Sequence, residues 1–158
     1  GGELALLRNN AAAAAAAFDR LRDVILASGE SSRVTVRANA LREIIRKEIK
    51  DGDVVAAEAN MRRWIVSAPQ AYQSGQYILT RTRLLRRMHW YAGGLALVDA
   101  FLSAHELPAY LPDLQLEKAY LLDALGRKNE ARALYREIHT EFPRHPVAKE
   151  AERLLREK

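Results

Sequence analysis

The chain of 158 residues carries a formal net charge of +5 at pH 7, and 49% of its residues are hydrophobic and 28% are charged. This composition is ordinary for one soluble globular or helical-repeat domain. Cysteine is absent, which excludes disulfides, thiol catalysis and thiolate metal sites, and no run of about 18 apolar residues is present to span a membrane. Glycine and proline are few and strand-like alternation is absent, so we expect an all-α protein.

Residues 1–29 are predicted to form a long N-terminal helix, which packs on or extends from a repeat domain of residues 30–158. Its apolar positions alternate steps of three and four in a heptad-like seam: Leu4, Leu7, Ala11, Ala14, Phe18, Leu21 and Ile25. Seven consecutive alanines, Ala11 to Ala17, favour a helix but offer little apolar area. We interpret them as an Ala-rich packing face, as a helix that joins two copies in a homo-oligomer, or as a stretch of uncertain sequence.

Apolar residues then recur at three- and four-residue steps in several shorter segments. Helices are predicted over residues 33–50, 54–68 and 77–88, with a looser segment at residues 70–76, and the partner of the third helix begins near Gly93-Gly94. The side chains that we expect to be buried in these helices are Leu41, Ile44, Ile45, Ile49, Ala57, Met61, Trp64, Ile78, Leu85, Met88, Leu95, Val98, Phe101 and Leu102.

Residues 113–143 predict two short helices joined by a tight turn. Gly126 follows the first helix, where a left-handed C-cap is needed, and a proline ends the second. The small residues Ala119 and Ala131 would let the two backbones approach closely. A final one-sided helix begins with Pro146 in its first turn and is expected to cap the domain.

The chain also matches itself when it is shifted by 37 residues. The aligned columns are Gly52, His89 and Gly126; Ala57, Gly94 and Ala131; Met61, Val98 and Tyr135; and Trp64, Phe101 and Ile138. The order of small, glycine, small, aromatic and proline residues resembles the tetratricopeptide repeat (TPR) family, with repeats at about residues 37–72, 73–110 and 111–144 and a capping helix at 145–158. The resemblance implies an all-α, right-handed TPR-like superhelix of about three helical hairpins, acting as an adaptor that holds another protein.

The segment from Tyr135 to Leu155 is further similar to repeats of bacterial envelope lipoproteins that act in outer-membrane assembly and in the Tol–Pal system. The matching residues are Phe142, Pro143, Pro146, Ala148, Lys149, Glu150 and Ala151. This resemblance implies a periplasmic adaptor, so a periplasmic or extracytoplasmic location is favoured over a cytoplasmic one.

No constellation of residues predicts catalysis, and we expect neither a cofactor nor a metal. A glycine-rich phosphate loop and a nucleophile elbow are absent. His139 and His145 are six residues apart across a proline, which is not the spacing of a helical zinc pair. Trp90 and Tyr91 have side chains suited to stacking on bases, but we expect them to pack beneath a turn.

Basic residues recur on one face of the first helix of successive predicted hairpins. The positions are Arg42, Arg46, Lys50, Arg83, Arg86 and Arg87, with Tyr120 in the last hairpin. In TPR proteins this helix lines the concave groove, so the resemblance places all seven side chains there.

We expect Arg42, Arg46, Arg83 and Arg86 to face one cavity, where an acidic peptide segment of a partner protein would relieve their mutual repulsion. A nucleic-acid-binding or regulatory protein using the same face is the alternative function, although nucleic acid is the less expected partner. Arginines that are merely solvated, or that pair with Glu43 and Glu48, would carry no function.

Overall fold

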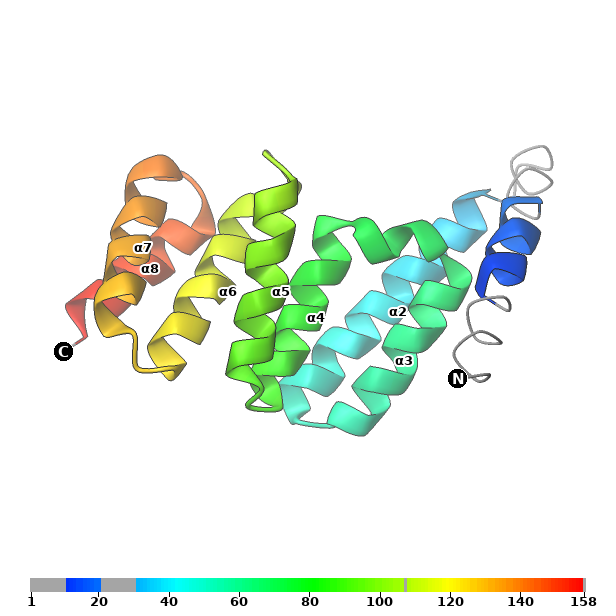
Figure 1. Ribbon diagram of the computed structural model, residues 1–158, viewed down its shortest axis with the longest axis horizontal. Helices are drawn as coiled ribbons and strands as arrows, with labels where there is room; N and C mark the ends of the chain where they lie inside the picture. The colour runs from blue at the N-terminus through cyan, green and yellow to red at the C-terminus, as the bar shows by residue number, and fades with distance from the viewer. Residues whose placement is uncertain (1–10, 21–30, 107, 158) are drawn as a thin grey trace.

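The computed structural model describes residues 11–20, 31–106 and 108–157, with only the backbone for residues 31–36, and this part of the chain consists of helices and turns (Figure 1). The elements are α2 (Ser31–Asp51), α3 (Val54–Ser67), the 3-10 helix η1 (Pro69–Gln73), α4 (Gly75–Arg87), α5 (Tyr91–Ala104), α6 (Leu111–Ala124), α7 (Lys128–Glu141) and α8 (Pro146–Arg156). Residues 11–20 are also helical, with the alanines exposed and Phe18 partly buried. The remainder of the predicted N-terminal helix, including Leu4, Leu7, Leu21 and Ile25, lies outside the described residues.

The helices pack as antiparallel pairs, α2 with α3, α4 with α5 and α6 with α7, and α8 packs against α6 and α7. The pairs lie side by side in an elongated row (Figure 1). Helices α2, α4, α6 and α8 contact one another in succession, so they form one layer of the row. The all-α array of three hairpins with a C-terminal helix is therefore confirmed.

The turn of each hairpin passes through the left-handed backbone region, which the sequence predicts for Gly126. The φ angles are 81° at Gly52, 61° at His89 and 79° at Gly126. A side chain added at Gly126 would meet nothing within 4 Å, so the backbone angle alone accounts for glycine there. His89 adopts the same conformation without being glycine, and its ring stacks on Tyr91 with the centroids 5.6 Å apart.

Buried side chains form two clusters rather than one. The smaller cluster joins α2, α3 and α4 around Ile45, Trp64 and Leu84. The larger joins α4 to α8 around residues such as Val98 and Ile138. Tyr77 packs against both clusters. The predicted columns of small and large residues supply this core, because Ala57, Ala131, Met61 and Tyr135 are all at most 2% exposed.

Several expectations about burial need correction. Ile44 is 49% exposed. The equivalent residues one and two repeats later, Arg81 and Lys118, form ion pairs with the preceding hairpin, whereas no hairpin precedes α2 among the described residues. Trp90 is 59% exposed, since it lies at the tip of the second hairpin and belongs to neither cluster. Four further side chains are only partly buried at the edges of the clusters: Leu41, Ile49, Met88 and Leu102.

Within the described residues, none of the helices combines the length and the apolar character required to cross a membrane.

Candidate peptide-binding surface

The seven predicted groove residues lie on α2, α4 and α6, which are neighbours in one layer. The structure divides them between two cavities rather than one. A cavity of about 210 Å³ between α2 and α4 is lined by Arg42, Arg46 and Arg83. A second cavity of about 400 Å³, at the ends of α4 and α6, is lined by Arg86, Arg87 and Tyr120. Lys50 is exposed on α2 and lines neither of these two cavities.

A buried carboxylate pairs with two of the arginines between α4 and α6 and offsets part of their charge. Glu117 is 3% exposed and accepts hydrogen bonds from Arg83 Nε at 3.3 Å, from Arg86 Nε at 2.7 Å and from Arg86 Nη2 at 3.2 Å. Burial lowers the pKa of Arg86, but the hydrogen bonds and the charge of Glu117 outweigh it, and the net pKa is raised. Two predicted peptide-binding arginines therefore have an internal counter-ion, so an anionic partner is not needed to relieve their repulsion.

The same polar network continues from α6 to α8. The guanidinium of Arg86 lies 4.9 Å from the centre of the Tyr120 ring, and the Tyr120 hydroxyl donates to Glu150 Oε1 at 3.2 Å. Burial and the neighbouring Glu150 raise the pKa of Tyr120. Arg153 pairs with Glu150 and lowers its pKa. Tyr120 is therefore engaged inside the chain by Arg86 over its ring and by Glu150 at its hydroxyl.

Arg87 tethers the first two hairpins. Its Nε donates to the carbonyl oxygen of Ile49, near the end of α2, at 3.1 Å. A Cβ added at Gly52 would lie 2.7 Å from Arg87 Nη2, so the guanidinium covers this turn closely. The C-terminal carbonyls of a helix favour such a cation, which gives Arg87 a structural role.

The junction between α2 and α4 has no equivalent of Glu117. Thr80 occupies the corresponding position one repeat earlier, 37 residues before Glu117. Arg46 approaches only Glu43, at 4.0 Å, and the two side chains are 75% and 76% exposed. An ion pair with this exposure contributes little. The cavity between α2 and α4 therefore keeps positive charge that no buried carboxylate in the described chain offsets.

Arg42 completes this cavity. Its Nη2 donates to Asn39 Oδ1, and its guanidinium lies 6.0 Å from the centre of the Trp64 ring. Arg42 Nε is buried and donates to no acceptor in the described structure. A buried donor without an acceptor costs about 1–3 kcal/mol, so an acceptor supplied from outside would be favourable here.

Sequence reasoning missed Tyr110, which lines the same cavity. Tyr110 is 43% exposed and has a φ of 66°, immediately before α6. Its loop lies against the start of α4, where a Cβ on Gly75 would stand 2.2 Å from the carbonyl oxygen of Ala109. Gly75 thus permits the approach that brings Tyr110 over the cavity. The prolines near Tyr110 predict a connecting loop in the sequence, but they do not predict which helix the loop packs against.

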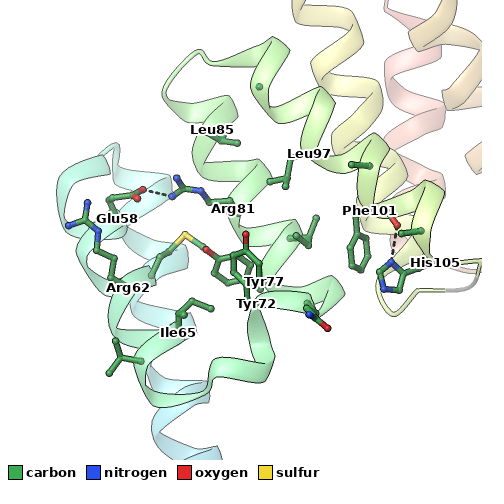
Figure 2. Close-up of a pocket in the computed structure, with 17 residues that line it drawn as sticks. Glu58, Arg62, Ile65, Tyr72, Tyr77, Arg81, Leu85, Leu97, Phe101 and His105 are labelled. Carbon is green, nitrogen blue, oxygen red and sulfur yellow. Dashed lines mark hydrogen bonds and ion pairs between the residues drawn. The ribbon is translucent and has the colours of Figure 1, made fainter. Parts of the chain in front are cut away.

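A larger, apolar cavity of about 980 Å³ lies between α3 and α5, with α4 behind it (Figure 2). Its apolar lining includes Met61, Ile65, Tyr77, Leu85, Leu97 and Phe101. Figure 2 shows the ion pair of Arg81 with Glu58 on one side and the hydrogen bond of His105 Nδ1 to the Phe101 carbonyl oxygen, 3.0 Å, on the other. We call this cavity, with the outer face of α3 beside it, the α3 groove. The sequence did not reveal it, because each lining residue separately is typical of a core or of a solvated face.

The histidines considered for a metal site have other contacts. His145 Nδ1 accepts a hydrogen bond from the Val147 amide at 3.2 Å and caps α8. His139 lies 3.9 Å from Glu152. Over residues 11–20, 31–106 and 108–157, no three His, Asp or Glu side chains are grouped as they would be to hold a metal ion.

Comparison with known proteins supports the class of fold. No family model and no curated protein sequence matches the chain. Among solved structures, the Arabidopsis OM64 TPR domain is similar, with a TM-score of 0.55 and 17% sequence identity over 75% of this chain and 93% of that chain. Identity this low supports the fold alone. The chain thus has the fold of a TPR-like helical-repeat domain.

Proposed function

We propose that this protein is a non-enzymatic interaction module that binds an acidic peptide segment of a partner protein between α2 and α4. The observation that carries the proposal is the contrast between the two junctions: Glu117 pairs with both Arg83 and Arg86, whereas Thr80 leaves Arg42 and Arg46 without a buried acid. Arginine suits a carboxylate because its planar fork donates two parallel hydrogen bonds.

The small number of charged contacts at this site predicts moderate affinity. Two or three charge-assisted contacts contribute roughly 1.5–3 kcal/mol each. The free energy lost in ordering the peptide and its side chains offsets much of that gain. The expected dissociation constant is therefore on the order of micromolar.

The test is fluorescence anisotropy with a labelled peptide of consecutive glutamates that has a free C-terminus, compared with the same peptide made of glutamine. Arg46→Glu should weaken binding of the glutamate peptide at least tenfold, since the Arg46 side chain is 75% exposed and its replacement leaves the core intact. Arg136→Glu, on exposed α7, is the matched control for net charge. Equal affinities of the wild-type chain and Arg46→Glu would reject this site.

Arg83→Glu is a poorer test of the same site. It would place a second carboxylate beside Glu117, which is 3% exposed. Like charges at a buried position destabilise the fold, so lost binding could not be separated from unfolding. A double replacement of Arg46 and Arg83 by glutamate would therefore not be neutral for stability.

The exposure of Trp90 keeps the nucleic-acid alternative testable, because an exposed indole next to cations can stack on a base. Lys128 and Arg86 nearby are paired with Asp123 and Glu117, which reduces the charge available for phosphates. Binding of a single-stranded oligonucleotide that weakens steeply with salt, with a slope equivalent to several phosphates, would favour this alternative.

Two finer features complete the proposal. The motif from Phe142 to Ala151 supports a periplasmic or extracytoplasmic location, and cell fractionation of the source organism tests it.

The apolar seam from Leu4 to Ile25 supports self-association through the N-terminal helix. Sedimentation showing a monomer over a wide concentration range would reject self-association.

A further inference from the structure

An apolar stripe runs along the outer face of α3. Val55, Ala59, Arg62 and Val66 recur at steps of four, three and four residues, which places them on one side of the helix. Val55 is 79% exposed and Val66 is 59% exposed. Large apolar side chains this exposed, in a row on one element, are typical of interaction surfaces.

The stripe is continuous with the large cavity. A smaller cavity of about 310 Å³, lined by Val54, Val55 and Ala59, shares Glu58 and Arg62 with the cavity of about 980 Å³ between α3 and α5. The α3 groove therefore extends along α3 from Val55 to the exposed Tyr72 just beyond it.

The packing of the hairpins explains why the groove is open. Helix η1 packs between α3 and α4, whereas α5 packs closely on α6 along its length. The two hydrophobic clusters consequently meet through Tyr77, and the space between α3 and α5 is left to solvent. The packing of the helices at this junction forms the groove, and α3 and α5 form its two sides (Figure 2).

Charge is distributed unevenly around the groove. Glu58 is engaged by Arg81, and the Nδ1 of His105 is engaged by the backbone. Arg62 lines both cavities and is exposed, and none of the carboxylates in the described part of the chain pairs with it. A partner surface that matches this groove would therefore be apolar and would carry one negative charge near its middle, opposite Arg62.

We infer that the α3 groove binds an amphipathic helix of a partner protein, which lies along α3, buries its apolar side chains between α3 and α5 and presents an acidic residue to Arg62. Helix α3 has 14 residues. At 1.5 Å per residue α3 is about 21 Å long, which matches three to four turns of a bound helix and exceeds what a small ligand needs. The groove and the proposed acidic-peptide site use different faces of α4, so the two partners would not compete.

The probe is a fluorescein-labelled 16-residue helix with leucine at helical spacing and glutamate flanking the apolar face. Its matched control peptide has lysine in place of each glutamate. Both are titrated against the intact chain and against Val66→Glu, Arg62→Glu and Arg136→Glu, with circular dichroism as the check on folding. Val66 and Arg62 are exposed, so these replacements leave the hydrophobic clusters intact.

The wild-type chain should bind the glutamate-flanked helix at least tenfold more tightly than the lysine-flanked helix. Val66→Glu should weaken binding at least tenfold, Arg62→Glu should reverse the preference between the two peptides, and the charge control Arg136→Glu, at an exposed position of α7, should change neither. Equal binding by wild type and Val66→Glu, or no reversal in Arg62→Glu, would overturn the inference. It would also be overturned if Val66→Glu converted a self-associated chain to a monomer in sedimentation, because a second copy would then occupy the groove.

Discussion

At the scale of single residues, Tyr135 is the buried polar group whose role is easiest to test. It is 2% exposed and occupies the column of Met61 and Val98, where the earlier repeats carry apolar side chains. Its hydroxyl is buried and makes no hydrogen bond within the described structure. The ring therefore contributes to the core, while the hydroxyl carries a desolvation cost.

We expect Tyr135→Phe to be as stable as the wild type or more stable by about 1 kcal/mol, because it removes an unsatisfied polar group and keeps the ring. Denaturant unfolding measures the difference. A loss of more than about 1 kcal/mol would mean that the hydroxyl has a partner, such as an ordered water, whose removal costs a hydrogen bond.

Tyr135 also predicts how the stability of the fold changes at alkaline pH. Burial, together with Asp123 and Glu150, raises the pKa of Tyr135 from 10.0 to about 12. The unfolded chain therefore ionises this phenol first, so its contribution to stability is complete below pH 10 and is lost between pH 10 and about 12. The melting temperature of Tyr135→Phe should fall less than that of the wild type over this range. Parallel curves for the two proteins would contradict the assignment.

At the scale of elements, each hairpin depends on a close crossing of its two helices. Ala119 on α6 and Ala131 on α7 are 0% and 1% exposed in the larger cluster. Gly94 serves a similar purpose on α5, since a Cβ there would lie 3.1 Å from Leu121 Cδ2 on the next hairpin. Small residues at these points set the spacing of the layers.

Ala131→Leu should lower the free energy of unfolding by about 1–3 kcal/mol, because added methylenes in a packed core force strained rotamers or backbone shifts. Denaturant unfolding measures the loss. The control is Ala133→Leu on the exposed side of the same helix, which should be nearly neutral. An unchanged midpoint for Ala131→Leu would contradict a tight crossing of α6 and α7.

At the scale of the whole molecule, the row of hairpins is not uniformly coupled. The smaller cluster joins α2 and α3 to α4, and the larger cluster joins α4 to α8. Tyr77 bridges them, with its ring 5.5 Å from the rings of both Trp64 and Tyr72. In arrays of repeats, stability is approximately a sum of terms within repeats and between neighbours, so a weak junction allows one end to open first.

We therefore expect Tyr77→Ala to cost about 2–3 kcal/mol and to separate the unfolding of α2–α3 from that of α5–α7. Hydrogen exchange measured by mass spectrometry should show early loss of protection confined to the first hairpin. Uniform loss along the chain would show that the two clusters remain one cooperative unit. Val55→Ala, at a 79% exposed position of α3, is the control.

The periodicity of the sequence was sufficient to predict the helices, the left-handed turn at Gly126 and the small residues at the helix crossings, because these depend on residues within one repeat. His89, which departs from glycine in the aligned column, adopts the same left-handed conformation, and only the structure showed this. Which residues meet between repeats depended on the tertiary structure. Only the packing of α4 on α6 pairs Arg83 and Arg86 with Glu117, and only the insertion of η1 opens the α3 groove. The physical reason is that the charge and exposure of a side chain depend on neighbours from other hairpins, which local spacing does not specify.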